Sequence, residues 1–302
     1  MPDASEQAAV LALVARTQLA WHWTGALIEE AGGAKRLLAG DLGSVAWFNR
    51  GDAQALARAV EPDEVARYAE LAAGLAARGV GLLTVLDDDY PAALHAAYDR
   101  PPFLFTRGSL AAAGGRAVAI AGAPSGPLAE VDRARDLAGA LARAGVAVVA
   151  CPRGDLGLAA LWAALDVRGR AVAVLDAGID HPDPGLPAEL ERGLSGLGAV
   201  VSPHWPDAPP EPASELHAAT LSGLALGLVV LDGEEGSPTQ RQAHRCLDQG
   251  RRLFLHRPLV LRESWAKHYA GHPGATVVDA VDDILEVVTA MMQLRAQLSA
   301  MT

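Results

Sequence analysis

The stretch that decides the fold is AVAIAGAPSGPLAEVDRARDLAGALARAGVAVVA, residues 117–150. It begins with an apolar run at 117–121, breaks at the Gly- and Pro-rich segment 122–127, and ends with a second apolar run at 146–150. Between them apolar residues recur every three or four positions, as on one helix face, and Gly145 stands where a helix-capping glycine belongs. Runs that are apolar at every position are typical of strands buried on both faces of a parallel sheet. The stretch therefore predicts a strand, a turn, a crossover helix and a parallel strand.

The composition predicts a globular protein with ample core and no overall attraction to polyanions. The chain has 302 residues, of which 51% are hydrophobic and 20% are charged, and this excludes wholesale disorder. Its net charge is −11, so a nucleic-acid role would require a local positive patch. The cationic side chains are almost all arginines, since Lys35 and Lys267 are the two lysines of the sequence.

Cysteine usage and hydropathy predict a cytoplasmic protein with no membrane partner. Cys151 and Cys246 have no CxxC neighbour, which is typical of reduced cysteines in the cytosol. No apolar run approaches the roughly 18 residues that a membrane-spanning helix needs. The acidic segment at residues 1–6 lacks the basic region of a signal peptide.

Residues 1–80 predict a small all-helical domain of the SAM or helix-hairpin-helix kind. Ser5 is expected to cap the first helix, and the segment WHWTG at 21–25 is expected to interrupt the helical pattern. Helix pairs joined by glycine turns can grip a DNA backbone, but this segment lacks the Gly-x-Gly of such turns. A packing role is therefore favoured for this domain.

A series of motifs, in order, resembles the DNA-processing protein A (DprA/Smf) family. The motifs are DYP at 89–91, RPPFLFTRG at 100–108, VAIAG at 118–122, AVAVLDAGID at 171–180, GAVVSP at 198–203, LSGL at 221–224, LVVLD at 228–232 and QGRRLF at 249–254. No single motif is specific, and the ordered set carries the resemblance. It implies an extended Rossmann-like domain behind a small helical domain. It also implies binding of single-stranded DNA and loading of a RecA-type recombinase during DNA uptake, without enzymatic activity.

The sequence departs from the family at each segment of its DNA pocket. The family's Gly-Thr-Arg turn is replaced by GAP at 122–124, and its Ser-Gly-x-Ala-x-Gly-Ile-Asp turn by ACPRGDLG at 150–157, which retains Arg153. The family's Arg-Asn-Arg run aligns with HAA at 217–219, and its Ser-Gly helix start with GSPT at 236–239. The resemblance therefore implies weakened or altered DNA binding.

Turns that leave a buried strand and enter a helix are the expected phosphate-binding segments, because they direct backbone N–H groups and the positive helix end at an anion. We expect the glycine-rich strand exits to meet at one rim of the sheet. Ser237 is expected to be an N-cap with Pro238 in the first turn, whereas Pro124 and Pro127 remove donors from the other turn. The candidate nucleic-acid or phosphate contacts are Gly122, Ser125, Gly126, Arg153, Ser237, Thr239, Arg241 and Arg245.

The densest run of basic residues lies near the C-terminal third of the chain. Arg241 and Arg245 are expected to share a helix face. Any nucleic-acid patch is expected to combine the following arginines: Arg153, Arg241, Arg245, Arg251, Arg252 and Arg257. Ordinary solvated arginines are the alternative.

No catalytic residue, metal site or cofactor is expected. The segment GEEGSPTQ at 233–240 is similar to the Gly-Gly-x-Gly-Thr-x-x-Glu signature of lysine-decarboxylase-like nucleotide hydrolases, but Gln240 replaces the glutamate and an amide cannot act as a general base. His268 and His272 have i, i+4 spacing, but glycine and proline around them disfavour a helical zinc site. Three consecutive aspartates at 87–89 predict a solvated turn.

These observations predict an α/β protein with an extended Rossmann-like, mostly parallel sheet. The expected domains are a helical one at 1–80 and a Rossmann-like one at 81–302, with no C-terminal winged helix. The chain is expected to end in a helix with Asp279 as N-cap and Asp282 at its third position. The leading function is a single-stranded DNA-binding recombination-accessory protein, acting as a homodimer with a RecA-type recombinase. The alternatives are a small-nucleotide sensor or scaffold at the Gly122 turn and a paralogue retained for protein interactions.

Overall fold

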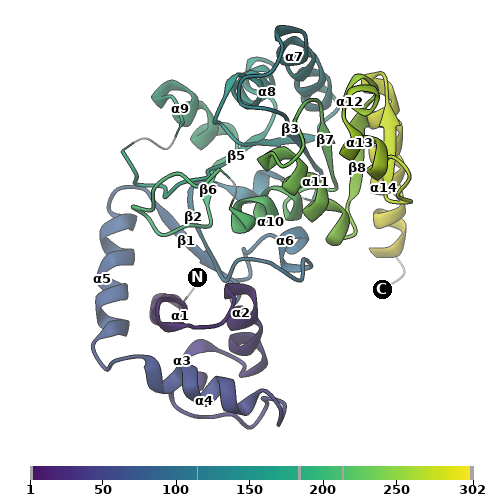
Figure 1. Ribbon diagram of the computed structural model, residues 1–302. Coiled ribbons are helices and arrows are strands. Elements are labelled where there is room, and N and C mark those ends of the chain that lie inside the picture. The colour runs from purple at the N-terminus through teal and green to yellow at the C-terminus, as the bar shows by residue number, and fades with distance from the viewer. Residues whose placement is uncertain (1–2, 114, 183–184, 213, 300–302) are drawn as a thin grey trace. The chain divides into compact units, whose positions relative to one another are not determined.

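The apolar runs of the sequence form a parallel β-sheet, as predicted. The computed structural model describes residues 3–113, 115–182, 185–212 and 214–299. In this part of the chain the parallel strands run in the order β6-β5-β4-β3-β7-β8-β9 (Figure 1). Their bounds are β3 (Ala117–Ala121), β4 (Ala147–Ala150), β5 (Ala171–Val174), β6 (Ala199–Ser202), β7 (Gly227–Val230), β8 (Arg252–His256) and β9 (Ala275–Val278).

Strand β3 stands at the point where the chain reverses its direction across the sheet. From β3 the chain proceeds through β4, β5 and β6 on one side, and from β7 through β8 and β9 on the other. Val118 pairs with Val148 of β4 and with Gly227 of β7, and Val118 and Val148 are fully buried. In open parallel sheets, ligands bind outside the carboxyl ends of the strands at this reversal. The topology therefore places the expected binding region beyond Ala121 and Val230.

Helices cover both faces of the parallel sheet. Right-handed crossovers require that the connections from β3 to β6 lie on one face and those from β6 to β8 on the other. The first group is α7 (Leu128–Arg143), α8 (Asp155–Asp166) and α9 (Ala188–Leu197), and the second is α10 (Glu215–Gly223) and α11 (Pro238–Asp248) (Figure 1). The remaining helical segments of this region are α6 (Ala92–His95), η1 (Leu110–Ala113), α12 (Arg257–Arg262), α13 (Ser264–Tyr269) and α14 (Val281–Ser299). The expected Rossmann-like α/β fold is confirmed.

Contacts divide the chain into two compact units. The first holds the residues up to Tyr90 together with Tyr98–Arg107, and the second holds Pro91–Ala97 and the chain from Gly108 onward. The predicted domain boundary between residues 80 and 81 stays a prediction. None of the helices in the described ranges is long and apolar enough to cross a membrane.

The first unit is mostly helical. Its helices are α1 (Ala4–Arg16), α2 (Trp21–Glu30), α3 (Ala34–Leu38), α4 (Arg50–Ala59) and α5 (Glu64–Ala76), followed by the antiparallel strands β1 (Gly81–Thr84) and β2 (Phe103–Gly108). Leu11 and Leu13 of α1 are fully buried, so this helix forms the core of the unit. Asp87 accepts hydrogen bonds from the Thr84 backbone N–H and the Gln7 amide, so this aspartate of the predicted turn holds the turn in place.

Several helix ends differ from the prediction. Asp3, and not Ser5, is the N-cap of α1, and its carboxylate accepts from the Ser5 backbone N–H. Residues 21–25 do not interrupt a helix: they are the first turns of α2, and the turn is formed four residues earlier, where the Thr17 hydroxyl accepts from the Leu19 backbone N–H. The sequence pattern does not identify this turn, because threonine also occurs within helices.

The last helix also begins differently from the prediction. The carboxylate of Asp283 accepts from the backbone N–H groups of Asp279 and Ala280, so Asp283 caps this end in place of Asp282. The side chain of Asp279 instead accepts from Arg257. The predicted glycine cap at Gly145 is confirmed, with φ of +75° and its N–H donating to the carbonyl of Ala142 at the end of α7.

Candidate functional site

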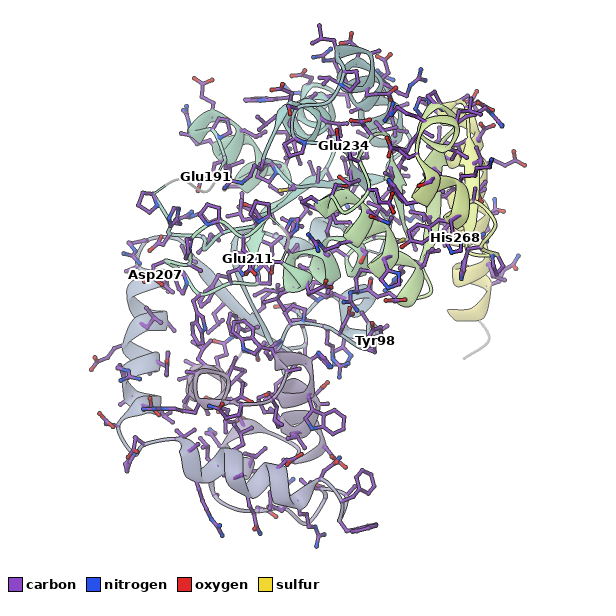
Figure 2. The ribbon with its side chains drawn as sticks, viewed as in Figure 1. Tyr98, Glu191, Asp207, Glu211, Glu234 and His268 are labelled. Atoms are coloured by element: carbon purple, nitrogen blue, oxygen red, sulfur yellow. The ribbon has the colours of Figure 1, made fainter. Side chains whose placement is uncertain are left out.

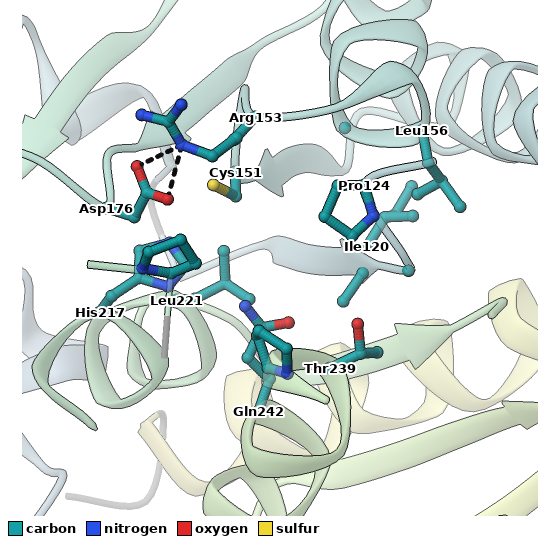
Figure 3. Close-up of a pocket in the computed structure, with 15 residues that line it drawn as sticks. Ile120, Pro124, Cys151, Arg153, Leu156, Asp176, His217, Leu221, Thr239 and Gln242 are labelled. Carbon is teal, nitrogen blue, oxygen red and sulfur yellow. Dashed lines mark hydrogen bonds and ion pairs between the residues drawn. The ribbon is translucent and has the colours of Figure 1, made fainter. Parts of the chain in front are cut away.

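The carboxyl ends of β3, β4 and β5 meet the start of α11 around one pocket (Figure 3). The pocket has a volume of about 50 Å³ and also contacts α8 and α10. The backbone of Gly122 lines it, together with the following polar side chains: Cys151, Arg153, Asp176, His217, Thr239 and Gln242. The strand exits therefore meet at one rim, as predicted, and this rim lies at the chain reversal.

An ion pair between Arg153 and Asp176 lies at one side of the pocket (Figure 3). The Arg153 Nε donates to both carboxylate oxygens of Asp176, at 2.9 and 2.8 Å. The Asp176 side chain is 1% exposed, whereas the Arg153 side chain is 26% exposed. Arg153 is thus the predicted arginine that lines the pocket, and the Asp176 carboxylate already binds it.

Cys151 lies beside this ion pair and is not an activated thiol. Burial and the charge of Asp176 raise the pKa of Cys151 to about 12. Because the thiolate is the nucleophilic form, this cysteine is inert near neutral pH. The geometry therefore offers no nucleophile at this position.

His217 brings a neutral imidazole to the pocket from the first turn of α10. Its backbone N–H donates to the Ser214 hydroxyl, which is the N-cap of that helix. The residue is 1% exposed, and burial lowers the pKa of the ring. Its Nε2 lies 3.2 Å from the carbonyl oxygen of Val174, so the neutral ring donates there and Nδ1 is an acceptor. Among the described residues Nδ1 has no hydrogen-bond partner.

Gly122 and Gly154 lie where the exits of β3 and β4 pack closely together. A Cβ on Gly122 would lie 2.3 Å from Cδ1 of Leu156, and a Cβ on Gly154 would lie 2.4 Å from Cα of Pro124. Gly154 also has φ of +90°, and the next backbone N–H, of Asp155, donates to the carbonyl oxygen of Pro124 at 3.0 Å. The exits of β3 and β4 are therefore packed backbone to backbone. Gly122 contacts the Leu156 side chain, so close packing accounts for a small residue there without a phosphate.

The side-chain carboxylates of Asp232 and Glu130 lie at the N-terminus of α7, where we expected a phosphate. A Cβ on Gly126 would lie 3.3 Å from Oδ2 of Asp232, which pairs with Arg262. Glu130, in the first turn of α7, lies 3.1 Å from Nδ1 of the buried His256. Burial raises the pKa of Glu130 and lowers the pKa of His256 to about 4. Acidic side chains are favoured at a helix N-terminus, so they compete with a bound anion there.

The first predicted turn is therefore a poor phosphate site on its outer side. Ser125, at its tip, is exposed and is not among the residues that line the pocket. Gly126 is half-buried and faces Asp232. The assignment of these two residues and Gly122 as phosphate contacts stays a prediction, which the neighbouring carboxylates disfavour.

The second predicted turn is built as expected. Ser237 is the N-cap of α11 and accepts from the Gln240 backbone N–H at 3.3 Å, with Pro238 at the first position. The Gln240 side chain accepts from the backbone N–H of Gly236, so it has a capping role. Thr239 is 2% exposed and lines the pocket. This confirms the cap and leaves phosphate binding by the turn a prediction.

The acidic residues around this turn are turned to solvent. Glu234 and Glu235 are exposed on the loop after β7, and Figure 2 labels Glu234. On the other side of the loop, the indole N–H of the buried Trp265 donates to the carbonyl oxygen of Gly233 at 3.1 Å. The loop is thus fixed at its base, and its acids add negative potential near the rim.

The predicted basic patch is divided between the two ends of the sheet. Arg252 begins β8 and is in register with Gly227, the first residue of β7, whereas Arg257 follows the last residue of β8. Arg251 donates to the carbonyl oxygen of Gly223 and Arg252 to that of Pro273, so both hold the amino-end connections together. The inclusion of Arg251 and Arg252 in a patch with Arg257 was wrong, because a strand length separates the two ends.

Arg241 and Arg245 are also engaged within the protein. Arg245 pairs with Glu215 of α10, and its side chain is 20% exposed. Arg241 is exposed and donates to the carbonyl oxygen of Gly236 at 3.4 Å. Arg241 and Arg245 lie four residues apart on α11, as expected, but have different partners, and their role in phosphate binding stays a prediction.

The histidine pair that resembled a metal site does not lie on one helix. Helix α13 ends at Tyr269, which separates His268 from His272, and Nδ1 of His272 accepts from the Gly274 backbone N–H. In the described ranges, no group of three or more His, Cys, Asp or Glu side chains could hold a metal ion.

Comparison with known proteins settles the family. The model of the family described as DNA recombination-mediator protein A matches residues 81–289. The chain belongs to the DNA recombination-mediator protein A family. It is 25% identical over 217 residues to DNA processing protein DprA of Bacillus subtilis, covering 69% of this chain and 71% of that protein. It is 31% identical over 200 residues to Protein Smf of Escherichia coli, covering 65% of this chain and 54% of that protein.

Solved structures of this family share the fold. DNA processing protein A of Streptococcus pneumoniae superposes with a TM-score of 0.67 at 20% identity, covering 93% of this chain and 97% of that one. DNA processing protein A of Helicobacter pylori, whose structure was reported for its single-stranded DNA binding mode, gives a TM-score of 0.58 at 17% identity. The match covers 71% of this chain and 96% of that one.

Three pocket residues of this family member were not identified from the sequence. Asp176 follows the buried β5, so the rule that selected Gly122 after β3 could have found it. His217 stands in the HAA segment that aligns with the family's Arg-Asn-Arg run, and Gln242 follows the GSPT helix start, but neither side chain is among the predicted contacts. The packing of α10 and α11 against the strand exits brings both to the pocket. They are the residues that a fold is needed to find.

Proposed function

We propose that this DNA recombination-mediator protein A family member binds single-stranded DNA at the pocket formed by the strand exits, as a recombination-accessory protein and not as an enzyme. The family assignment and the DNA-binding relative from Helicobacter pylori support this function. The observation that carries the location is the convergence of the exits of β3, β4 and β5 around Arg153. Arginine holds phosphate with a planar fork of donors.

Binding at this pocket requires an exchange of partners. A DNA phosphate competes with the Asp176 carboxylate for the Arg153 guanidinium, which now binds that carboxylate through Nε. The Arg153 side chain is 26% exposed, so it is reachable from solvent, while Asp176 lies beneath it at 1% exposure. Release of the carboxylate costs part of the phosphate's binding energy. We therefore expect affinity that is weaker than an unpaired arginine would give.

The surroundings of the pocket also act against strong binding. Glu211 precedes the pocket residue Pro212, and both Glu211 and Glu234 are exposed (Figure 2). With a net charge of −11, the protein repels a polyanion at a distance. Binding is consequently expected at low salt and is expected to weaken as salt rises.

Fluorescence anisotropy of a labelled oligothymidylate tests the proposal. The wild-type protein is expected to bind at micromolar concentration in about 50 mM salt and somewhat more weakly at about 200 mM, with a shallow dependence on salt. Arg153→Gln is expected to weaken binding about tenfold, since a hydrogen bond to a charged group contributes about 1.5 kcal/mol or more. Arg135→Gln, which removes the same charge from an exposed pair with Asp132 on α7, is the control. No binding by the wild type, or equal binding by the two variants, contradicts the proposal.

The partners and the location follow from the family resemblance alone. We propose a RecA-type recombinase as protein partner, a homodimer as the assembly and the cytoplasm as the location. Light scattering of the purified protein measures the assembly, and a pull-down with a purified RecA-type recombinase measures the partner. The comparisons do not favour the small-nucleotide alternative, and thermal shift with a nucleotide panel would reveal it if melting temperature rose.

A further inference from the structure

Two adjacent aromatic side chains project into solvent from the helical first unit. Trp47 is 81% exposed and Phe48 is 66% exposed, although the other large apolar side chains of this unit are mostly buried. Their ring centroids lie 5.8 Å apart with the planes at 85°, an edge-to-face pair. Exposure of two large aromatic groups side by side is unfavourable in water unless something covers them. The packing of this unit does not use these rings.

The turn that carries the rings is held rigidly from below. The two oxygens of the Glu30 carboxylate accept from the Ala46 backbone N–H at 2.8 Å and from the Asn49 side-chain amide at 2.9 Å. These hydrogen bonds lower the pKa of Glu30, and the one from Asn49 has the largest effect. Arg50 adds a hydrogen bond from its Nε to the carbonyl oxygen of Val45 at 3.0 Å. The rings are therefore presented by a fixed turn, which reduces the entropy lost when a partner binds.

Two cations of the segment from α3 to α4 are available to a partner. Lys35 pairs with Asp3 and Arg36 with Asp41, whereas the exposed Arg50 and Arg58 have no ion pair among the described residues. Arg58 also lines an open cleft of about 250 Å³ between α3 and α4. A partner that is attracted to this segment is therefore negatively charged.

A partner that combines flat rings with negative charge is a single-stranded nucleic acid. We propose that Trp47 and Phe48 form a second DNA contact, on which unpaired bases stack while the phosphates lie near Arg50. Every base has a face that can stack on an aromatic side chain, so the contact is indifferent to sequence. The inference rests on the proposed binding of single-stranded DNA, but not on the pocket at Arg153.

Replacement of both rings in the full-length protein tests the contact. The variant Trp47→Ala/Phe48→Ala is expected to raise the Kd for a labelled oligothymidylate about tenfold, which corresponds to about 1.4 kcal/mol. Because no charge is removed, the slope of log affinity against log salt is expected to stay unchanged. Trp47→Phe/Phe48→Tyr keeps both rings and is expected to keep the wild-type affinity. Leu261→Ala removes an equally exposed apolar side chain, at 80% exposure, and is the control.

The outcomes separate this inference from the pocket. Loss of affinity in the alanine variant together with unchanged affinity in Arg153→Gln supports the aromatic contact and contradicts the pocket. Unchanged affinity in the alanine variant, while Arg153→Gln weakens binding, overturns the aromatic contact alone. Loss in the conservative ring-to-ring variant equal to that in the alanine variant also overturns it, because stacking then does not explain the effect. A wild-type protein that binds no single-stranded DNA overturns both.

Discussion

Replacement of Asp176 with asparagine is expected to strengthen binding of single-stranded DNA. In the structure the Asp176 carboxylate accepts twice from the Arg153 Nε and is 1% exposed, so it holds the arginine that a phosphate must bind. Asparagine has nearly the same shape but no charge, and it offers one oxygen acceptor in place of two. The guanidinium is then held less strongly and exchanges more easily to a phosphate.

The expected gain follows from the hydrogen bonds that are lost. A hydrogen bond to a charged partner contributes about 1.5–3 kcal/mol net. The amide oxygen of asparagine keeps part of this, so we take the lower value, which corresponds to about a tenfold lower Kd. If the substitution lets Arg153 neutralise one further phosphate, the slope of log affinity against log salt becomes steeper by about 0.7 for a single strand. Affinity and salt slope are thus expected to rise together.

The assay is a salt titration of anisotropy with a labelled oligothymidylate. Asp132→Asn on α7 removes the same charge from an exposed arginine pair in the same unit. It reports the general effect of a less negative protein, which is expected to be small. Equal gains in Asp176→Asn and Asp132→Asn, or a loss of affinity in Asp176→Asn, would refute the competition between carboxylate and phosphate.

A stability measurement accompanies the binding assay, because Asp176 is buried. Asp176→Asn is expected to lower the free energy of unfolding by about 1 kcal/mol. The value is at the low end because the Arg153 side chain is 26% exposed and solvent can screen it. Urea denaturation gives this number. A higher affinity in a less stable protein shows that the ion pair stabilises the fold at the expense of binding.

Four further expectations concern the stability of the fold, each measured by urea denaturation. Gly157→Ala is expected to cost about 3 kcal/mol or more, because a Cβ there would lie 1.8 Å from a carbonyl oxygen of the β4 exit. Gly74 lies on α5 with open space around its Cβ position, so Gly74→Ala is expected to raise the free energy of unfolding by about 0.5–1 kcal/mol. A lower stability would show that open space around a helical glycine does not predict the effect of alanine. Burial lowers the pKa of His204 to about 4. The unfolded chain, with a histidine pKa of about 6.5, therefore takes up the proton first as pH falls, and about 2 kcal/mol of stability is lost between pH 6.5 and 5. His204→Gln is expected to remove this part of the pH dependence, and an unchanged slope between pH 7 and 5 would contradict the assignment. Ser237→Ala is expected to cost about 1 kcal/mol through loss of the α11 cap, whereas an unchanged stability would show that Gln240 caps the helix unaided.

The sequence predicts the strands better than the contacts among their exits. The runs at 117–121 and 146–150 are apolar at every position, and this pattern identifies buried parallel strands without further information. The Ser237 cap is similarly local, because a serine before a proline satisfies the first free N–H groups of a helix. These predictions succeed because the residues that interact are within a few positions of each other.

The pairing of arginines with carboxylates is beyond such local patterns. Arg153 and Asp176 are 23 residues apart, and Arg245 and Glu215 are 30 apart. Each pair joins the exits or helices of different strands, so it exists only once the sheet order is set. The sequence shows the cations but not whether the protein already binds them, and this is the property that decides DNA affinity.

Glycines in a turn have the same ambiguity. Gly122 follows a buried strand, which predicts close approach of a ligand, yet a Cβ there would meet Leu156 at 2.3 Å. Gly154 likewise allows the backbone of Pro124 to come close. Gly154 brings the two strand exits together, while Gly122 and Leu156 line the pocket. A glycine motif therefore predicts a close approach, and only the structure tells whether a ligand or a second loop approaches.

The formal charge of the pocket itself limits how it can recognise DNA. Arg153 contributes one positive charge and Asp176 one negative charge, and burial keeps His217 neutral by lowering the pKa of its ring. Their sum is zero, so the pocket offers no net field to attract a phosphate from a distance. Recognition must instead proceed by exchange of hydrogen bonds at contact, which predicts a shallow salt slope for the wild type. A steep slope would mean that cations elsewhere on the protein bind most of the strand.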